Sequence, residues 1–245
     1  MCRMMLVAQQ AGLTKALGEL TFLPVVGTIT PGSGTSNTNQ TLNFTTTYTD
    51  SDGWQDISYV LFLANNGISG VNCLYARYNR FENKLYLRNN EHAAWIGGYV
   101  PGSNNVIENS YAKINCAQTT ISGSGNTLTV NWSVVFKSPF TGQKKTYLYA
   151  VDNTNAYNGW VQKGTWTINN QAPAVGAITP ASGTVFTDQD LNFSASYSDP
   201  DTWLNIQYVH LLVNVAGGYT NCLYTYYNQD TNKLYLRNDS ATSWL

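Results

Sequence analysis

The sequence predicts an all-β protein built as an antiparallel β-sandwich, and three observations support this prediction. Short runs of β-branched and aromatic residues recur along the 245 residues, bounded by Gly, Pro, Asn and Ser, as strands separated by turns require. Only 11% of the residues are Asp, Glu, Lys or Arg, against a typical ~25%, so long charged helices are not expected. No segment after residue 25 shows the 3.6-residue period of a helix.

The strands follow one another along the chain. In residues 41–49, Leu42, Phe44 and Tyr48 share one face at a period of two, and Asn and Thr occupy the other face. A stricter apolar stripe runs from Leu128 to Phe136. Residues 79–83 and 122–126 predict turns. Strands are expected at residues 25–30, 41–49, 57–63, 73–78, 84–88, 127–136, 146–151 and 164–168. Seven or eight short strands with no helices between them indicate an immunoglobulin-like sandwich.

An internal repeat organises the chain. The run VGTITPGSGT starting at Val26 returns as VGAITPASGT starting at Val175, and the offset of 149 (175 − 26) then holds to the last residue. Accordingly, residues 1–23 are expected to be a lead-in outside the repeat, 24–168 a complete repeat, 169–173 a linker, and 174–245 a truncated second repeat. The lead-in lacks the long apolar centre and small-residue cleavage site of a signal peptide.

The second repeat stops in mid-pattern at Leu245. Two explanations are open: the sequence is a fragment of a longer tandem array, or the repeat is completed by another molecule. In either case the inner face of its strands lacks a covering sheet. We therefore expect this repeat to be poorly stable alone or to require a partner strand.

The cysteines follow the repeat. Cys73 is equivalent to Cys222, whereas the counterpart of Cys116 would be residue 265 (116 + 149), beyond the last residue. A complete repeat thus holds two cysteines, which favours a disulfide between Cys73 and Cys116; two buried free thiols are the alternative. A disulfide would indicate a location outside the cytoplasm.

The motif order ITPGSGT, YTDSDGW, CLY, NKLYLRN, INC, SGSGNTLTV and GTWTI resembles the immunoglobulin-like or fibronectin-III-like tandem repeats of large secreted and cell-surface bacterial proteins. The resemblance covers nearly all of residues 25–245. It implies a spacer, an adhesion unit or an accessory domain beside an enzyme, and it implies a disulfide in the cysteine pair. It names no ligand.

Two acidic turns are candidate calcium sites. In Asp50-Ser51-Asp52-Gly53 and Asp199-Pro200-Asp201-Thr202, carboxylates at i and i+2 could present oxygens to one hard cation. Asp56 lies four residues on, and Asp152 ends a later strand that the fold could bring to the same pole. The alternative is that these side chains only stabilise turns by accepting backbone hydrogen bonds. The candidate ligands are Asp50, Asp52, Asp56, Asp152, Asp199 and Asp201.

The tryptophans could instead stack on sugar rings. Trp54 and Trp95 recur at fixed repeat positions beside strands, and Trp132 lies within the inward stripe, so a core position is expected for all three. Trp160, in an Asn-Gly-Trp turn, is expected to be exposed and is the candidate ligand-binding residue.

Composition excludes several function classes. A net charge of −1 argues against nucleic acid, and no apolar run reaches the ~18 residues that membrane insertion requires. With two histidines and no triad, Walker or dinucleotide motif, we expect no enzyme and no required cofactor beyond a candidate Ca²⁺. The predicted function is a non-catalytic spacer or adhesion repeat, secreted or on the cell surface; the alternative is a carbohydrate-binding accessory module of an extracellular enzyme. The expected partners are neighbouring repeats, a polysaccharide or another surface protein.

Overall fold

The computed structural model describes residues 22–245, and nearly all of its regular structure is strand. The predicted all-β class is confirmed. Most of the predicted lead-in lies outside the described residues. Among the described residues, no helix has the length and apolar character needed to cross a bilayer. The chain divides into two compact units, Met1–Asn169 (unit 1) and Asn170–Leu245 (unit 2).

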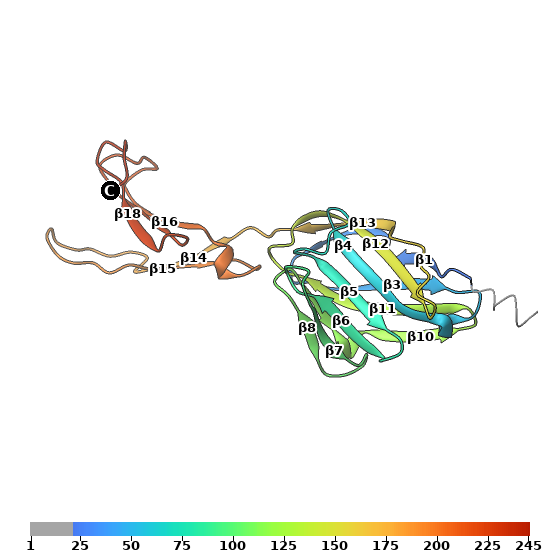
Figure 1. Cartoon of the computed structure of the whole chain (residues 1–245). Helices are drawn as coiled ribbons and strands as arrows, with labels where there is room; N and C mark the ends of the chain where they lie inside the picture. The colour runs from blue at the N-terminus through green and yellow to red at the C-terminus, as the bar shows by residue number, and fades with distance from the viewer. Residues whose placement is uncertain (1–21) are drawn as a thin grey trace, which may run out of the picture. The chain divides into compact units, whose positions relative to one another are not determined.

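Unit 1 is a sandwich of two sheets (Figure 1). The first sheet, sheet A, contains in spatial order β1 (Val25–Thr30), β3 (Thr41–Thr49), β11 (Thr127–Phe136), β9 (Ala112–Asn115) and β8 (Val106–Glu108), with β10 (Thr120–Ser124) also pairing β11. The second, sheet B, contains β2 (Ser33–Asn37), β13 (Val161–Asn169), β12 (Gly142–Asp152), β4 (Ile57–Asn65), β5 (Leu74–Asn79), β6 (Lys84–Arg88) and β7 (Trp95–Tyr99). Every pairing is antiparallel except that of β2 with β13.

The core fills the space between the two sheets. The predicted inward stripe of β11, from Leu128 to Phe136, is fully buried, which confirms that prediction. Phe44 from sheet A meets Phe62 from sheet B edge to face, with ring centroids 5.4 Å apart. The buried Trp132 also satisfies its one donor, since its Nε1 donates to Thr46 Oγ1 at 3.0 Å. Trp132 is therefore a core residue, as expected.

In the described part of unit 1, all eight predicted strands are present, together with five further strands that were not predicted. Strands β2, β8, β9 and β10 are short or rich in Ser, Thr and Gly, and β7 contains Gly97 and Gly98, so none shows a clear apolar alternation. The predicted hairpin turn at residues 79–83 is confirmed. The predicted turn at 122–126 is too long, because β10 continues to Ser124 and only Gly125 and Asn126 form the turn.

Unit 2 repeats the local structure of unit 1 without its closing strands. It contains β14 (Ala174–Thr179) paired with β15 (Ser194–Ser198), and β16 (Tyr208–Val213), β17 (Leu223–Asn228) and β18 (Lys233–Leu236) in a second sheet. Positive φ angles recur at positions 149 residues apart: Asn39 and Asp188, Asn72 and Asn221, Asn83 and Asn232, His92 and Ala241. The repeat therefore extends to the backbone conformation of the turns.

The inner face of unit 2 is exposed, as expected for strands without a covering sheet. Val26 is 4% exposed, but its counterpart Val175 is 81% exposed; Leu85 is 0% exposed, but Leu234 is 75% exposed. Among the described residues of unit 2, no strand corresponds to β11, β12 or β13 of unit 1. The same side chains are thus core residues in one unit and surface residues in the other.

The predicted Cys73–Cys116 disulfide is wrong, because both thiols are free. Cys73 precedes β5 in sheet B, and its Sγ lies 3.5 Å from the carbonyl oxygen of Ser69. Cys116 begins the 3-10 turn η2 (Cys116–Gln118) that follows β9 of sheet A. Both are buried, and burial raises the pKa of the Cys73 thiol to about 12 and that of the Cys116 thiol to about 11. The alternative of two buried free thiols holds.

Candidate functional site

Four carboxylates gather at one end of the unit 1 sandwich, and we call this cluster the acidic pole: Asp50, Asp52, Asp56 and Asp152. Asp50 directly follows β3, and Asp56 ends the 3-10 turn η1 (Trp54–Asp56). One carboxylate oxygen from each of Asp50, Asp52 and Asp56 lies within 4.8 Å of the others. Asp152, the last residue of β12, pairs with Ile57, which directly follows Asp56 in the sequence. The fold therefore brings Asp152 to the pole, as its sequence position suggested.

Turn stabilisation accounts for one carboxylate oxygen of Asp50 and one of Asp152. Asp50 Oδ1 accepts a hydrogen bond from the Asp52 backbone N–H at 2.9 Å. Asp152 Oδ1 accepts three, from the Thr154 N–H and hydroxyl and from the Ala156 N–H, at 2.8–2.9 Å. Among the described residues, however, the Oδ2 atoms of Asp50, Asp56 and Asp152 are buried and have no hydrogen-bond partner. Buried carboxylate oxygens left without a donor are costly, so their presence requires an explanation.

The electrostatics of the pole are unfavourable without a counter-ion. Burial, together with the neighbouring carboxylates, raises the pKa of Asp50 above its usual value. The pKa of Asp56 is raised by burial first and then by the charge of Asp152. Arg80 is the cation whose charge acts against this rise at Asp56, and its guanidinium donates to the Ile57 carbonyl and to Asn153 Oδ1. One guanidinium does not balance four carboxylates.

Unit 2 carries only part of this arrangement. Asp199 Oδ1 accepts from the Asp201 N–H at 2.8 Å, as Asp50 does from Asp52, and Asp199 Oδ2 is likewise buried without a hydrogen-bond partner among the described residues. Asp201 is buried and accepts from the Gln171 N–H. Asn205 stands where unit 1 has Asp56, and the counterpart of Asp152 would be residue 301 (152 + 149). The two predicted ligands Asp199 and Asp201 therefore lack the other two carboxylates.

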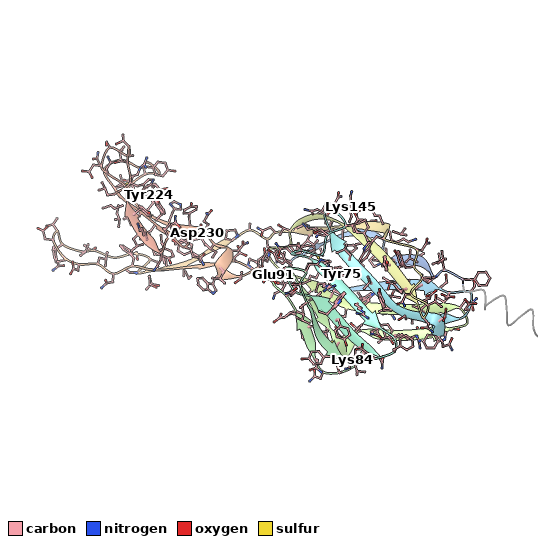
Figure 2. The ribbon with its side chains drawn as sticks, viewed as in Figure 1. Tyr75, Lys84, Glu91, Lys145, Tyr224 and Asp230 are labelled. Carbon is pink, nitrogen blue, oxygen red and sulfur yellow. The ribbon has the colours of Figure 1, made fainter. Side chains whose placement is uncertain are left out.

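A second candidate site covers the solvent side of sheet B, and we call it the aromatic face. Side chains at alternate strand positions point away from the core there, because the residues between them are buried. Tyr75, labelled in Figure 2, lies near its centre on β5. The aromatic face consists of Tyr59, Tyr75, Arg77, Tyr86, Arg88, His92, Trp95, Tyr149, Tyr157 and Trp160.

The distribution of the tryptophans between the core and the surface differs from the prediction. Trp95 is half-buried on the aromatic face, so its expected core position is wrong: it pairs with Arg88 across β6 and β7 and faces away from the core. Trp54 is half-buried and packs against the core, in agreement with the prediction. Trp160 is half-buried rather than freely exposed, and its ring lies 5.4 Å from that of Tyr75 and 5.2 Å from that of Tyr149.

Two arginines lie between the rings of the aromatic face. The Arg77 guanidinium carbon lies 4.4 Å from the Tyr59 ring centroid, and that of Arg88 lies 4.2 Å from the Trp95 ring centroid. No ion pair among the described residues involves either arginine, and both Nε atoms are buried without a hydrogen-bond partner. The sequence did contain a signal for this surface, since Tyr75-x-Arg77 and Tyr86-x-Arg88 place planar groups at a period of two.

In each unit a second ring stacks on the tyrosine at the same repeat position, Tyr75 or Tyr224, but the stacking residue comes from a different repeat position in each unit. In unit 1, His92 stacks on Tyr75 with centroids 5.3 Å apart, and a Cβ at Gly70 would lie 2.3 Å from the imidazole. In unit 2, Tyr219 occupies the position of Gly70 and stacks on Tyr224 at 5.0 Å, while Ala241 replaces His92. Tyr224 is labelled in Figure 2. At the two repeat positions next to this tyrosine, each unit therefore has one large side chain and one small one.

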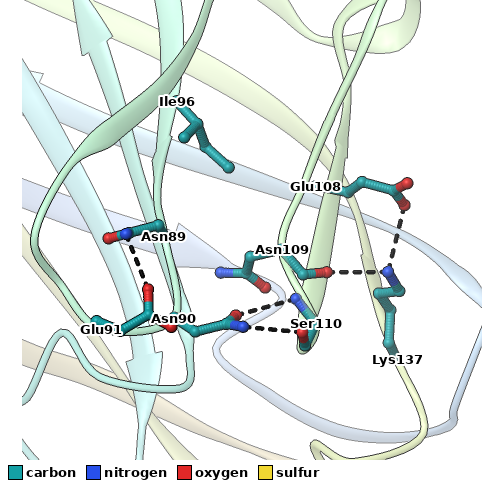
Figure 3. A pocket seen from close by; sticks show the side chains of 8 residues that line it. All are labelled: Asn89, Asn90, Glu91, Ile96, Glu108, Asn109, Ser110 and Lys137. Carbon is teal, nitrogen blue, oxygen red and sulfur yellow. Dashed lines mark hydrogen bonds and ion pairs between the residues drawn. The ribbon is translucent and has the colours of Figure 1, made fainter.

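A polar depression of about 380 Å³ lies elsewhere on unit 1, between the β6–β7 turn and the β8–β9 turn (Figure 3). Its polar side chains bond one another: Asn90 Nδ2 donates to Ser110 Oγ at 2.8 Å, and Lys137 Nζ pairs with Glu108 at 3.3 Å. Asn109 Nδ2 donates to the carbonyls of Cys73 and Arg88, and its Oδ1 accepts from the backbone N–H groups of Tyr111 and Ala112. These side chains hold the turns together, and the depression is best described as structural.

Comparison of the chain with protein-family models and with curated proteins gives no match.

Proposed function

We propose that the chain is a non-catalytic immunoglobulin-like tandem repeat of a secreted or cell-surface bacterial protein, and that it adheres to polysaccharide through its aromatic face. The observation that carries this proposal is the recurrence of the aromatic face in both units. In unit 2 the corresponding groups are Tyr208, Tyr224, Tyr226, Tyr235, Arg237 and Trp244, with Tyr219 stacked on Tyr224.

The chemistry of this surface suits sugar rings. Tyrosine and tryptophan offer a flat apolar face beside a polar edge, which matches the C–H face and hydroxyl rim of a pyranose. Arg77 of unit 1 and Tyr226 of unit 2 occupy the same repeat position. Both side chains offer a planar group that can stack, but only the guanidinium of Arg77 is charged. What both units share is therefore the capacity to stack, and a polysaccharide chain could engage more than one unit.

The role as an accessory module of an extracellular enzyme is the second candidate, and the aromatic face favours it equally. The accessory module and the adhesion repeat would bind polysaccharide in the same way, and the two roles differ only in the activity of the rest of the protein. A catalytic role for this chain has less support, because His92 stacks on the Tyr75 ring and His210 packs at a tilt against the rings of Tyr224 and Tyr226.

The proposed extracellular location rests on the resemblance and on the low charge of the chain. The cysteine pair no longer supports it, since both thiols are free.

The test is retention of the full chain by polysaccharides in affinity electrophoresis, with cellulose, xylan and polygalacturonate as probes. We expect retention by at least one probe and a loss of at least tenfold in affinity for the double variant Trp95→Ala/Trp244→Ala. Phe186→Ala is the matched control, because Phe186 is 78% exposed but lies outside the aromatic face.

Near-ultraviolet circular dichroism establishes that each variant is folded. Equal retention of the double variant and the wild type, or no retention by any of the three probes, would contradict the proposal. A drop in retention by polygalacturonate alone for Arg77→Ala would identify an acidic polysaccharide as the preferred ligand and support the proposal.

A further inference from the structure

We propose that the acidic pole of unit 1 binds one calcium ion through Asp50, Asp52, Asp56 and Asp152, and that this ion fixes the chain segment that enters the sandwich. This inference does not depend on the proposed adhesion to polysaccharide, because it concerns a different surface and a different measurement.

The orphaned oxygens point to a cation. Asp152 is 0% exposed and Asp50 is 1% exposed, yet each keeps one carboxylate oxygen without a donor while the other is fully used in a turn. If turn stabilisation were the only role, asparagine or serine would serve without the charge. Three buried carboxylate oxygens without a hydrogen-bond partner among the described residues, from Asp50, Asp56 and Asp152 on two separate chain segments, instead match the ligands of a hard cation.

The number and kind of ligands favour calcium. Calcium takes six to eight oxygens in irregular geometry, from carboxylates, carbonyls and water. The pole supplies four carboxylates and no nitrogen or sulfur ligand, and three of its carboxylates meet within 4.8 Å. A divalent ion would also offset the mutual repulsion of the carboxylates.

The entering segment is tied to the same carboxylates. The Phe22 backbone N–H donates to Asp52 Oδ2 at 2.9 Å, three residues before β1. The Gln171 N–H donates to Asp201 Oδ2 at 2.8 Å, three residues before β14. The same anchor thus recurs 149 residues later. An ion that orders Asp52 would order the start of the repeat with it.

Unit 2 supplies an internal comparison. It has the two turn carboxylates and the anchor, but Asn205 replaces Asp56, and none of its residues Asn170–Leu245 corresponds to Asp152. We therefore expect one strong calcium site in the chain and not two.

The experiment measures metal binding by the full chain directly. Tb³⁺ should bind at the pole and show luminescence sensitised by Trp54, the residue two positions before Asp56, and Ca²⁺ should displace it with a stoichiometry of one. Relative to EGTA, Ca²⁺ at about 100 times its Kd should raise the Tm by about 5–10 °C.

Asp152→Asn is the decisive variant, because the amide keeps an oxygen for the Thr154 and Ala156 hydrogen bonds while it removes one charge. We expect it to lose at least tenfold in calcium affinity, and its Tm in EGTA to equal or exceed that of the wild type, since repulsion is relieved. Asp56→Asn should behave in the same way. Asp190→Asn, at an exposed aspartate in unit 2, is the matched control and should leave calcium binding unchanged.

The outcomes separate the two interpretations. If the wild type shows no Tm shift between Ca²⁺ and EGTA, or if Asp152→Asn lowers the Tm in EGTA and leaves the calcium response intact, the carboxylates only stabilise turns and the proposal is overturned. Retention by polysaccharides in EGTA is measured in parallel, so that a failure at either site is recognised separately.

Discussion

The contrast between Leu85 and Leu234 offers a quantitative test of the packing. The two leucines occupy the same repeat position on β6 and β18, but Leu85 is 0% exposed and Leu234 is 75% exposed. Leucine to alanine removes three carbon atoms. At ~0.8 kcal/mol for each buried carbon, the transfer loss at Leu85 is about 2.4 kcal/mol, and the cavity raises the cost to about 3–4 kcal/mol. At Leu234 only a quarter of the side chain is covered, so the expected cost is about 0.6 kcal/mol.

Hydrogen exchange measured by mass spectrometry can follow both sites in one molecule. Peptides covering β5–β6 and β17–β18 report the free energy of local opening of each hairpin separately. We expect Leu85→Ala to reduce the opening free energy of the first hairpin by about 3–4 kcal/mol, and Leu234→Ala to change that of the second by less than about 1 kcal/mol. A loss above 2 kcal/mol at Leu234 would refute the reasoning, because it would mean that a covering layer buries this side chain in solution.

Two further predictions concern the Asn109 hydrogen bonds and the reactivity of the cysteines. Asn109→Asp should lower its stability by about 2–4 kcal/mol in urea unfolding, because a carboxylate would face the carbonyl oxygens of Cys73 and Arg88 in place of the amide donor; a change below 1 kcal/mol would contradict the assigned hydrogen bonds. In a Cys2→Ser background at pH 8, the half-exposed Cys222 should react rapidly with a thiol reagent, whereas the raised pKa values of Cys73 and Cys116 should leave both unreactive until the protein unfolds; rapid labelling of three thiols would contradict their burial.

Strand positions with strong alternation could be predicted, and those held by backbone pairing could not. Residues 127–136 carry five large apolar side chains at a period of two, so strand and inward face are both visible in the sequence. Residues 33–37, Ser-Gly-Thr-Ser-Asn, form β2 because the parallel neighbour β13 supplies hydrogen-bond partners. That pairing brings together residues about 130 positions apart, and no local pattern encodes it.

The candidate sites likewise combine residues that a local sequence pattern predicts with residues whose position depends on long-range strand pairing. The i, i+2 carboxylates of Asp50 and Asp52 are a local pattern, and the expectation that Asp152 would join them relied on its position at the end of a strand. Trp95 was misplaced because an aromatic residue beside a strand fits either face of the sheet, and only the register with Arg88 decides which one. The disulfide failed because residue counts alone do not show whether two cysteines approach each other.

The register of unit 1 has a mechanical consequence. Val25 pairs with Thr49 at one end of the sandwich, whereas Asn169 lies beside Asn37, close to the start of β3 at the other end. The chain therefore enters and leaves unit 1 at opposite ends, so that tension applied to the chain on both sides of unit 1 would pull it lengthwise (Figure 1). Strand β13, the last of unit 1, is held between β2 and β12 by two ladders of hydrogen bonds that run across the direction of the pull, and these would have to break together in shear rather than one after another.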